Sequence, residues 1–204
     1  MRLATRLTLA AAALAALLAA GCAAAPRPPA APPPKSQRFS GTALLVVDVQ
    51  RIQFPICRQD AVLSAITRLV AKAEAARLPV IYVYHSLGEG CTPGEESWLL
   101  HPAIRPPEGH EQVRKTAGDS FVETELEALL DARKTGRLVV CGLSSTACVN
   151  AALWGAKSRG YRLVLAADAH SASLREDDGI IDRVNANWRQ WGASVLPVDQ
   201  IEFD

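Results

Sequence analysis

Several patterns that define common protein classes are missing from this chain of 204 residues. It has neither the GxGxxG turn of dinucleotide-binding proteins nor the GxxxxGK[ST] loop that binds phosphates, so we expect no cofactor. The formal net charge is only +1 and no arginine-rich run occurs, which argues against a nucleic-acid partner. There is no C-x-x-C pair and no internal repeat. A chain of this length accommodates one domain with a good core.

The N-terminus has the composition of an export signal. Arg2 and Arg6 flank the start of an apolar run rich in Ala and Leu, Leu7–Ala20, which is short for a membrane span. The following Ala-Gly-Cys resembles the lipobox of bacterial lipoproteins, although Ala19 stands where Leu is usual. This resemblance implies a signal peptide over residues 1–21, with Cys22 lipidated and anchored to the membrane. A plain signal peptide cut nearby is the alternative.

The segment after Cys22 is rich in proline. Ala23–Arg38 contains six of the 13 prolines and cannot pack a core. We expect residues 22–38 to form the lipidated cysteine and a stiff polyproline-like tether, reaching up to roughly 50 Å at about 3.1 Å per residue. Ala23 resembles the outer-membrane sorting signal of Gram-negative bacteria, which implies an exported, lipid-anchored protein on the periplasmic face of that membrane. The folded domain is then expected at residues 39–204.

Buried strands and amphipathic helices alternate through the rest of the chain. Short apolar, β-branched runs predict strands at Thr42–Val47, Val80–Tyr84, Val113–Arg114, Leu138–Cys141, Tyr161–Ala167 and Ala193–Pro197. Apolar residues at three- and four-residue spacing predict helices at Asp60–Arg77, Val122–Arg133, Cys148–Gly160 and Asp177–Gln190. This order predicts a single α/β domain: a doubly wound, Rossmann-like, mainly parallel sheet with helices on both faces.

One stretch, Arg137–Ala152, has the pattern of a strand, a tight Gly-initiated turn and a helix. It places Cys148 in the first turn of the helix, where unpaired N–H groups and the positive end of the dipole favour a thiolate. The same N–H groups can hold an oxyanion. Most single cysteines in α/β cores are simply buried, however, and Cys141 in the middle of the strand is expected to be one of these.

Two further polar residues follow predicted strands. Asp48 follows the first strand and Lys115 follows a shorter one, and the carboxyl ends of parallel strands meet at one edge of the sheet. There Asp48 can accept a proton from Cys148, while Lys115 holds the carboxylate and the developing negative charge. Taken singly, Asp48 is equally suited to cap a turn, and a lone lysine after a strand usually faces solvent.

Four segments together resemble the isochorismatase-like cysteine hydrolases, which include nicotinamidases, N-carbamoylsarcosine amidases and ureidoacrylate amidases. They are LLVVDVQ at Leu44–Gln50, LPVIYV at Leu78–Val83, KTAGDSF at Lys115–Phe121 and VVCGLSSTACVNAA at Val139–Ala152.

The resemblance implies a catalytic triad of Asp48 as general base, Lys115, and Cys148 as nucleophile. It also implies a non-proline cis peptide at Leu143–Ser144 and an oxyanion hole formed by the amides of Ser144 and Cys148. The expected reaction is hydrolysis of an amide or carbamoyl C–N bond in a small molecule. Relatives in this family are commonly dimers or tetramers.

The chain also departs from the family pattern. Nicotinamidases carry an Asp-x-His metal pair, which is missing here, so we expect neither a metal site nor nicotinamide as substrate. Residues predicted to line the substrate pocket, with packing or surface roles as the alternative, are Gln50, His85, Trp98, Phe121 and His170.

Cys57 and Cys91 lie in loops after neighbouring strands, and outside the cytoplasm such a pair is expected to form a disulfide. Two other functions compete with the hydrolase: a binding or scaffolding lipoprotein with a retired triad, and a thiol-transfer protein using Cys141 or Cys148.

Overall fold

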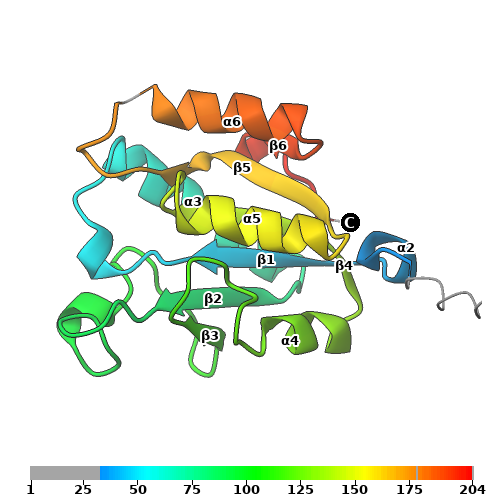
Figure 1. Cartoon of the computed structure of the whole chain (residues 1–204), viewed down its shortest axis with the longest axis horizontal. Helices are drawn as coiled ribbons and strands as arrows, with labels where there is room; N and C mark the ends of the chain where they lie inside the picture. The colour runs from blue at the N-terminus through cyan, green and yellow to red at the C-terminus, as the bar shows by residue number, and fades with distance from the viewer. Residues whose placement is uncertain (1–32, 178, 204) are drawn as a thin grey trace, which may run out of the picture. The chain divides into compact units, whose positions relative to one another are not determined.

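A computed structural model describes residues 33–177 and 179–203 (Figure 1). The predicted signal peptide, the lipidation site Cys22 and the tether up to residue 32 lie outside the described residues. Among the helices of the described residues, none has the length and apolar character needed to cross a bilayer.

The centre of the domain is a six-stranded sheet in which every strand pair is parallel. Its strands are β1 (Gly41–Val47), β2 (Val80–His85), β3 (Glu111–Lys115), β4 (Thr135–Leu143), β5 (Arg162–Ser171) and β6 (Ser194–Leu196). The order across the sheet is β3-β2-β1-β4-β5-β6. The chain therefore winds outward from β1 in one direction and then from β4 in the other. Open α/β sheets place their ligand crevice at the carboxyl ends of the strands at this switch point.

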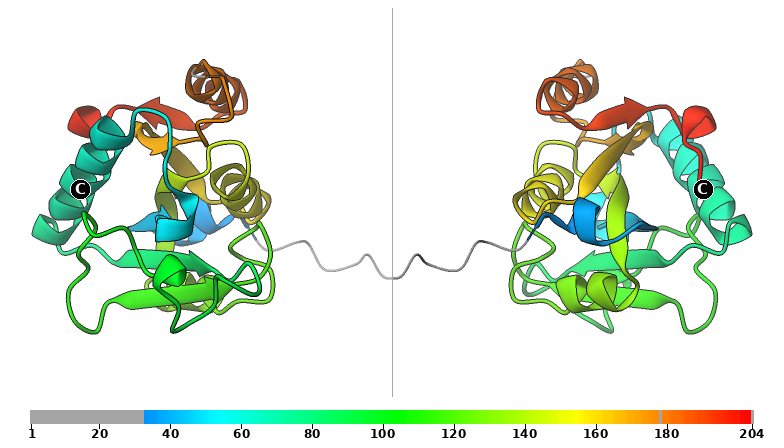
Figure 2. Two further views of the ribbon diagram at one scale, coloured as in Figure 1. Left: turned by 90° about the vertical axis from the view of Figure 1, so that its left-hand side faces the viewer. Right: turned by 90° about the vertical axis from the view of Figure 1, so that its right-hand side faces the viewer.

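Helices cover both faces of the sheet, as Figure 2 shows. They are α3 (Gln59–Ala75), α4 (Leu126–Ala132), α5 (Cys148–Ser158) and α6 (Ile180–Gln190). Alternate residues of β1 serve the two sides: Leu44 and Val46 share one apolar cluster with the buried residues of α3, and Leu45 and Val47 share another with those of α4, α5 and α6. The predicted doubly wound fold with helices on both faces is confirmed.

Strands β4 and β5 are longer than the apolar runs in the sequence predicted. β4 begins at Thr135, which pairs with Gly41 of β1. β5 continues to Ser171, because pairing of Gly142 with His170 and of Leu143 with Ser171 carries polar residues into the sheet. Conversely, α4 begins at Leu126 rather than Val122, where the Thr124 hydroxyl accepts a hydrogen bond from the Leu126 amide at 3.3 Å. Three short 3₁₀ turns complete the fold: η1 (Arg51–Gln53), η2 (Glu96–Trp98) and η3 (Val198–Gln200).

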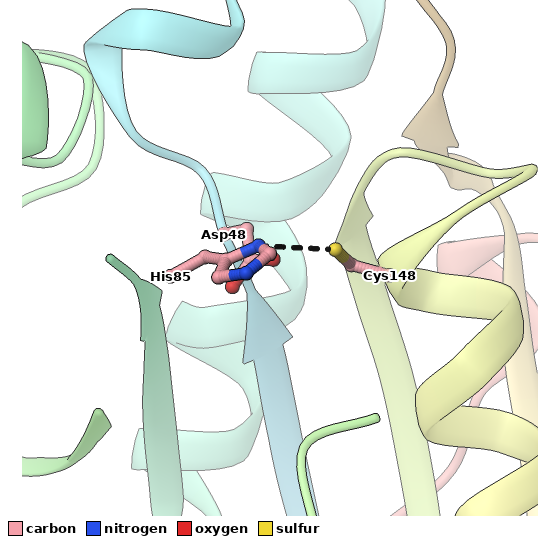
Figure 3. Close-up of side chains that lie close together, drawn as sticks. All are labelled: Asp48, His85 and Cys148. Carbon is pink, nitrogen blue, oxygen red and sulfur yellow. Dashed lines mark hydrogen bonds and ion pairs between the residues drawn. The ribbon is translucent and has the colours of Figure 1, made fainter. Parts of the chain in front are cut away.

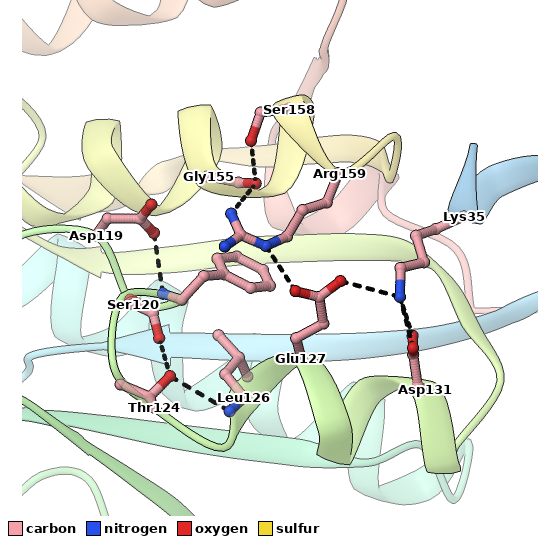
Figure 4. Close-up of polar contacts among 11 residues, drawn as sticks. Lys35, Asp119, Ser120, Thr124, Leu126, Glu127, Asp131, Gly155, Ser158 and Arg159 are labelled. Carbon is pink, nitrogen blue, oxygen red and sulfur yellow. Dashed lines mark hydrogen bonds and ion pairs between the residues drawn. The ribbon is translucent and has the colours of Figure 1, made fainter. Parts of the chain in front are cut away.

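Folded structure begins before Phe39, the expected start of the domain. The helix α2 (Lys35–Arg38) lies within the segment assigned to the tether. Its Lys35 is 8% exposed and pairs with Asp131 and, at 3.1 Å, with Glu127 of α4 (Figure 4). The lysine thereby attaches the segment to the domain, which proline content alone does not reveal.

Candidate active site

Asp48, Lys115 and Cys148 come together at the carboxyl edge of the sheet. Asp48 follows β1, Lys115 ends β3, and Cys148 opens α5 after β4, so each emerges at the same edge. Asp48 has a positive φ of 50°, and its amide donates to the carbonyl of Val83 in β2 at 3.0 Å. That bond anchors the turn beyond β1 to the neighbouring strand and fixes where the carboxylate points.

Asp48 and Lys115 form a buried ion pair. The Lys115 Nζ lies 2.9 Å from Asp48 Oδ2, and the side chains of both residues are fully buried. Lys115 also donates to the carbonyls of Ala117 at 3.2 Å and Gly118 at 2.9 Å. Burial raises the pKa of Asp48 above its usual value, while the Lys115 ammonium opposes that shift. The lysine is therefore a partner of the carboxylate and not a surface residue.

The loop that supplies those carbonyls is packed against α5. Asp119 Oδ1 accepts a hydrogen bond from the Phe121 amide at 3.0 Å (Figure 4). The same carboxylate lies so close to Gly155 that a Cβ built there would be 2.2 Å from Asp119 Oδ1. The absence of a side chain at Gly155 lets the loop seat on the helix that carries Cys148.

His85 lies beside both the thiol and the carboxylate (Figure 3). Its Nδ1 is 3.5 Å from Cys148 Sγ and 3.7 Å from Asp48 Oδ2, and the residue is 9% exposed. The sequence predicted His85 at the pocket edge, whereas the structure places it against the reacting groups. The signal was present, because His85 ends a buried strand in the way that Lys115 does.

The Cys148 thiol is held in its protonated form. Burial, followed by the charge of Asp48, raises its pKa to about 11, and Lys115 only partly offsets this. The expected preference of the helix N-terminus for the thiolate is opposed here by the burial of Cys148, which is 7% exposed. A nucleophile in this state needs a base beside it.

The turn before Cys148 has an unusual backbone. The peptide bond between Leu143 and Ser144 is cis, as predicted. Gly142, with φ of 116°, permits close packing on β1, since a Cβ there would meet the Val47 carbonyl oxygen at 2.1 Å. The Ser144 carbonyl accepts from Val149, and the Ser145 amide donates to Ser171. Within the described part of the chain, the Ser144 and Cys148 amides have no such acceptor, which leaves both available to an oxyanion.

Gln50 is a support and does not line the pocket as predicted. Its side chain is fully buried and clamps the backbone of His85 from both sides: Oε1 accepts from the His85 amide at 2.7 Å, and Nε2 donates to the His85 carbonyl at 3.1 Å. Nε2 also donates to the Trp98 carbonyl at 3.0 Å. One amide thus joins the end of β2 to the long loop.

The other predicted pocket residues divide between packing and proximity to the site. Trp98 stacks on Tyr84 at 4.5 Å in the apolar cluster on the α3 side. His170 is fully buried, with Nδ1 2.7 Å from Ser145 Oγ and Nε2 2.9 Å from Asn185 Oδ1, so both ring nitrogens are already engaged. Phe121 shares the apolar cluster of Cys148, on the α5 side. The contacts of Trp98 and His170 are those of packing residues, which was the alternative, and the pocket role of Phe121 stays a prediction.

The predicted disulfide between Cys57 and Cys91 does not form. Both are buried free thiols with different neighbours: Cys57 Sγ lies 3.5 Å from the Ser173 carbonyl, and Cys91 Sγ lies 3.7 Å from that of His85. Neighbouring strands do not place the two loops in register. Cys141 is fully buried, as expected, and burial raises its pKa.

Asp48, His85 and Cys148 also have the donor types of a metal site, since one ligand atom from each lies within 4.8 Å of the others. Lys115 opposes a cation, because its ammonium is 2.9 Å from the same Asp48 oxygen that a metal would need. The arrangement suits proton transfer at a thiol better than metal coordination.

Comparison with known proteins shows which family the chain belongs to. The model of the isochorismatase domain matches residues 42–194, and the chain belongs to the isochorismatase family. The chain is 35% identical to streptothricin hydrolase of Streptomyces noursei, and the match covers 79% of this chain and 61% of that enzyme. The chain therefore spans about three fifths of the length of this relative.

Two further proteins are similar. Ureidoacrylate amidohydrolase RutB of Methylobacterium radiotolerans is 27% identical over 63% of the chain and 66% of that enzyme. The crystal structure of N-carbamoylsarcosine amidase from Thermoplasma acidophilum superimposes with a TM-score of 0.68 at 25% identity, covering 80% of this chain and 99% of that one. The relatives of this chain thus include hydrolases.

Proposed function

We propose that this protein is a cysteine hydrolase that cleaves an amide or carbamoyl C–N bond in a small molecule. The observation that carries the proposal is the buried ion pair of Asp48 with Lys115 beside the Cys148 thiol, at the switch point of the sheet. Two of the matched relatives are named as an amidohydrolase and an amidase, which supports a C–N bond as the target.

In the proposed reaction, Cys148 Sγ attacks the substrate carbonyl carbon while its proton passes to the Asp48 carboxylate. The amides of Ser144 and Cys148 stabilise the oxyanion of the tetrahedral intermediate. Collapse of the intermediate breaks the C–N bond, and the leaving nitrogen takes the proton from Asp48. Water then hydrolyses the thioester, with Asp48 again as the base. Lys115 keeps the buried carboxylate oriented throughout.

Burial sets the scale of the substrate. Asp48 and Lys115 are at most 2% exposed and Cys148 is 7% exposed, so little of the reacting groups is open to solvent. This burial favours a small molecule as the substrate.

The alternative is a binding or scaffolding protein with a retired triad. It predicts that one of the reacting groups is lost or turned away, yet Lys115 Nζ remains at 2.9 Å from Asp48 and the thiol at hydrogen-bond distance from His85. A thiol-transfer role for Cys141 is disfavoured by its complete burial.

Location and assembly stay predictions. We propose that the protein is exported and lipid-anchored through Cys22, on the basis of its N-terminal sequence. Mass spectrometry of protein from membranes tests this: a diacylated Cys22 at the mature N-terminus is expected, and an unmodified N-terminus contradicts it. A dimer or tetramer is proposed from the family resemblance and is tested by light scattering.

The activity is tested by measuring release of ammonia or amine from a panel of primary amides, carbamoyl compounds and ureido compounds. Cys148→Ala is expected to lose turnover by at least about 100-fold, because covalent catalysis is removed. Cys141→Ala serves as the matched control, a buried cysteine outside the site. Equal turnover by wild type and Cys148→Ala on the same compound would refute the mechanism.

A further inference from the structure

His85 has contacts that the triad does not explain. Its Nδ1 lies within hydrogen-bond distance of the nucleophilic sulfur, 3.5 Å away, and 3.7 Å from the carboxylate that the proposed mechanism uses as the base. A single ring nitrogen therefore faces both the proton donor and the proton acceptor (Figure 3).

The fold holds the backbone around His85 in place by several contacts. Gln50, a fully buried amide, bonds the His85 backbone on both its N–H and C=O sides. The next amide, of Ser86, donates to the Lys115 carbonyl at 2.9 Å. Nδ1 can accept the thiol proton in the tautomer that carries the ring proton on Nε2.

Charges around His85 keep it ready to accept a proton. Burial lowers its pKa below the usual value, as does the Lys115 ammonium, while the Asp48 carboxylate opposes the shift. The groups that face the ring are Asp48 after β1, Lys115 at the end of β3 and Cys148 at the start of α5. The lowered pKa favours the uncharged imidazole, the form that can accept a proton.

We propose that His85 is a fourth catalytic residue, which carries the proton between the Cys148 thiol and Asp48. This inference rests on the proposed function. In acylation the S–H bond breaks as the S–C bond forms, and the proton moves to Nδ1 and from there to Asp48 Oδ2. When the C–N bond breaks, the leaving nitrogen takes that proton.

The second half of the cycle uses the same route. Water gives its proton to Nδ1, and from there to Asp48 Oδ2, as its oxygen bonds the thioester carbon. The C–S bond then breaks, and the departing thiolate of Cys148 recovers that proton from Asp48 through Nδ1. The sum is one amide and one water consumed and one acid and one amine formed, with no oxidant or reductant required. Gln50 acts in this scheme as a positioning residue for His85.

The test compares wild type, His85→Asn and His110→Asn in two assays. Asparagine keeps a polar atom near the position of Nδ1 but does not titrate. His110 is the matched control, because its ring contacts the Tyr84 hydroxyl at 3.2 Å and lies outside the site. One assay is kcat/KM against pH on a hydrolysed amide. The other is the rate of Cys148 alkylation by iodoacetamide against pH, located by mass spectrometry, which needs no substrate.

For His85→Asn we expect roughly 100-fold lower kcat/KM, in the range for loss of a general acid–base group. We also expect the rise of alkylation with pH to move upward by about one unit, and imidazole in solution to restore part of the activity of His85→Ala. His110→Asn should match wild type in both assays. His85→Gln replaces His85→Asn if thermal unfolding shows that the latter does not fold.

Two outcomes separate this inference from the proposed function. In the first outcome, wild type hydrolyses an amide, His85→Asn has a kcat/KM within twofold of wild type, and the pH profiles of the two proteins coincide. This would overturn the role of His85 but not the proposed hydrolase. No turnover by wild type on any compound would count against the hydrolase. The alkylation profiles would then decide on His85 alone: a shifted profile supports proton transfer to Nδ1, and coincident profiles overturn it.

Discussion

Replacing Lys115 by methionine tests how much the buried ion pair contributes to stability. Methionine preserves the length of the apolar stem but removes the ammonium that lies 2.9 Å from Asp48 Oδ2. Neither side chain is accessible to water, so solvent cannot take the place of the lost partner. The variant therefore leaves one carboxylate buried without its counter-charge.

The size of the effect follows from the distance. At 2.9 Å and an effective dielectric constant of about 20, the Coulomb attraction is about 6 kcal/mol. Part of this is offset by the desolvation of both charges, and breaking a buried pair by removing one partner typically costs about 3–5 kcal/mol. Removing both charges in Asp48→Asn/Lys115→Met should recover most of that loss, because no uncompensated charge remains.

The sign of the pH dependence is also fixed. Burial already raises the folded-state pKa of Asp48, and Lys115 is the main cause that lowers it. Without Lys115 the pKa of Asp48 rises further. The Asp48 carboxyl of the folded variant therefore stays protonated over a pH range in which that of wild type is ionised. Below the wild-type pKa the carboxyl is neutral in both proteins and the variant loses no ion pair. The deficit in stability therefore opens as pH rises above that value and widens until the higher pKa of the variant is reached.

Urea unfolding from about pH 4 to about pH 9 measures this pH dependence of stability directly. The proteins compared are wild type, Lys115→Met, Asp48→Asn and the double variant. The expected result is a Lys115→Met deficit that grows with pH and a double variant that is closer to wild type at neutral pH. A deficit independent of pH, or a double variant as unstable as Lys115→Met, would refute the assignment of a charged buried pair.

Two other substitutions test how the site is supported. Gly155→Ala should cost about 1–3 kcal/mol of stability and lower kcat, since its Cβ would meet the Asp119 carboxylate at 2.2 Å and displace the loop after Lys115. The control is Gly118→Ala, whose Cβ would lie 3.7 Å from another side chain. Equal effects of the two substitutions would contradict the packing argument. Lys35→Met should release α2 from Asp131 and open the segment to limited proteolysis; an unchanged cleavage pattern would show that the helix is held by other contacts.

The sequence by itself determined the fold class and selected three residues that lie together in the structure, Asp48, Lys115 and Cys148, whose catalytic roles stay a proposal. Continuous apolar runs such as Thr42–Val47 predict strands buried on both faces. Helices cover both faces of a parallel sheet, so side chains on either side of such a strand are apolar. Strand ends of a doubly wound sheet converge, so Asp48, Lys115 and Cys148 could be brought together without coordinates. The position of the cis peptide at Leu143–Ser144 came from the family resemblance, and the structure confirms it.

The tertiary structure decided the roles that depend on side-chain direction and burial. The sequence assigned the same pocket role to His85, His170 and Trp98. In the structure His85 reaches the Cys148 sulfur, whereas the ring nitrogens of His170 are hydrogen-bonded within the core and Trp98 stacks on Tyr84. The protonated state of the thiol likewise depends on loss of hydration at Cys148, a quantity that the whole fold sets. Local pattern fixes which residues emerge at the sheet edge, and long-range packing fixes which of them meet.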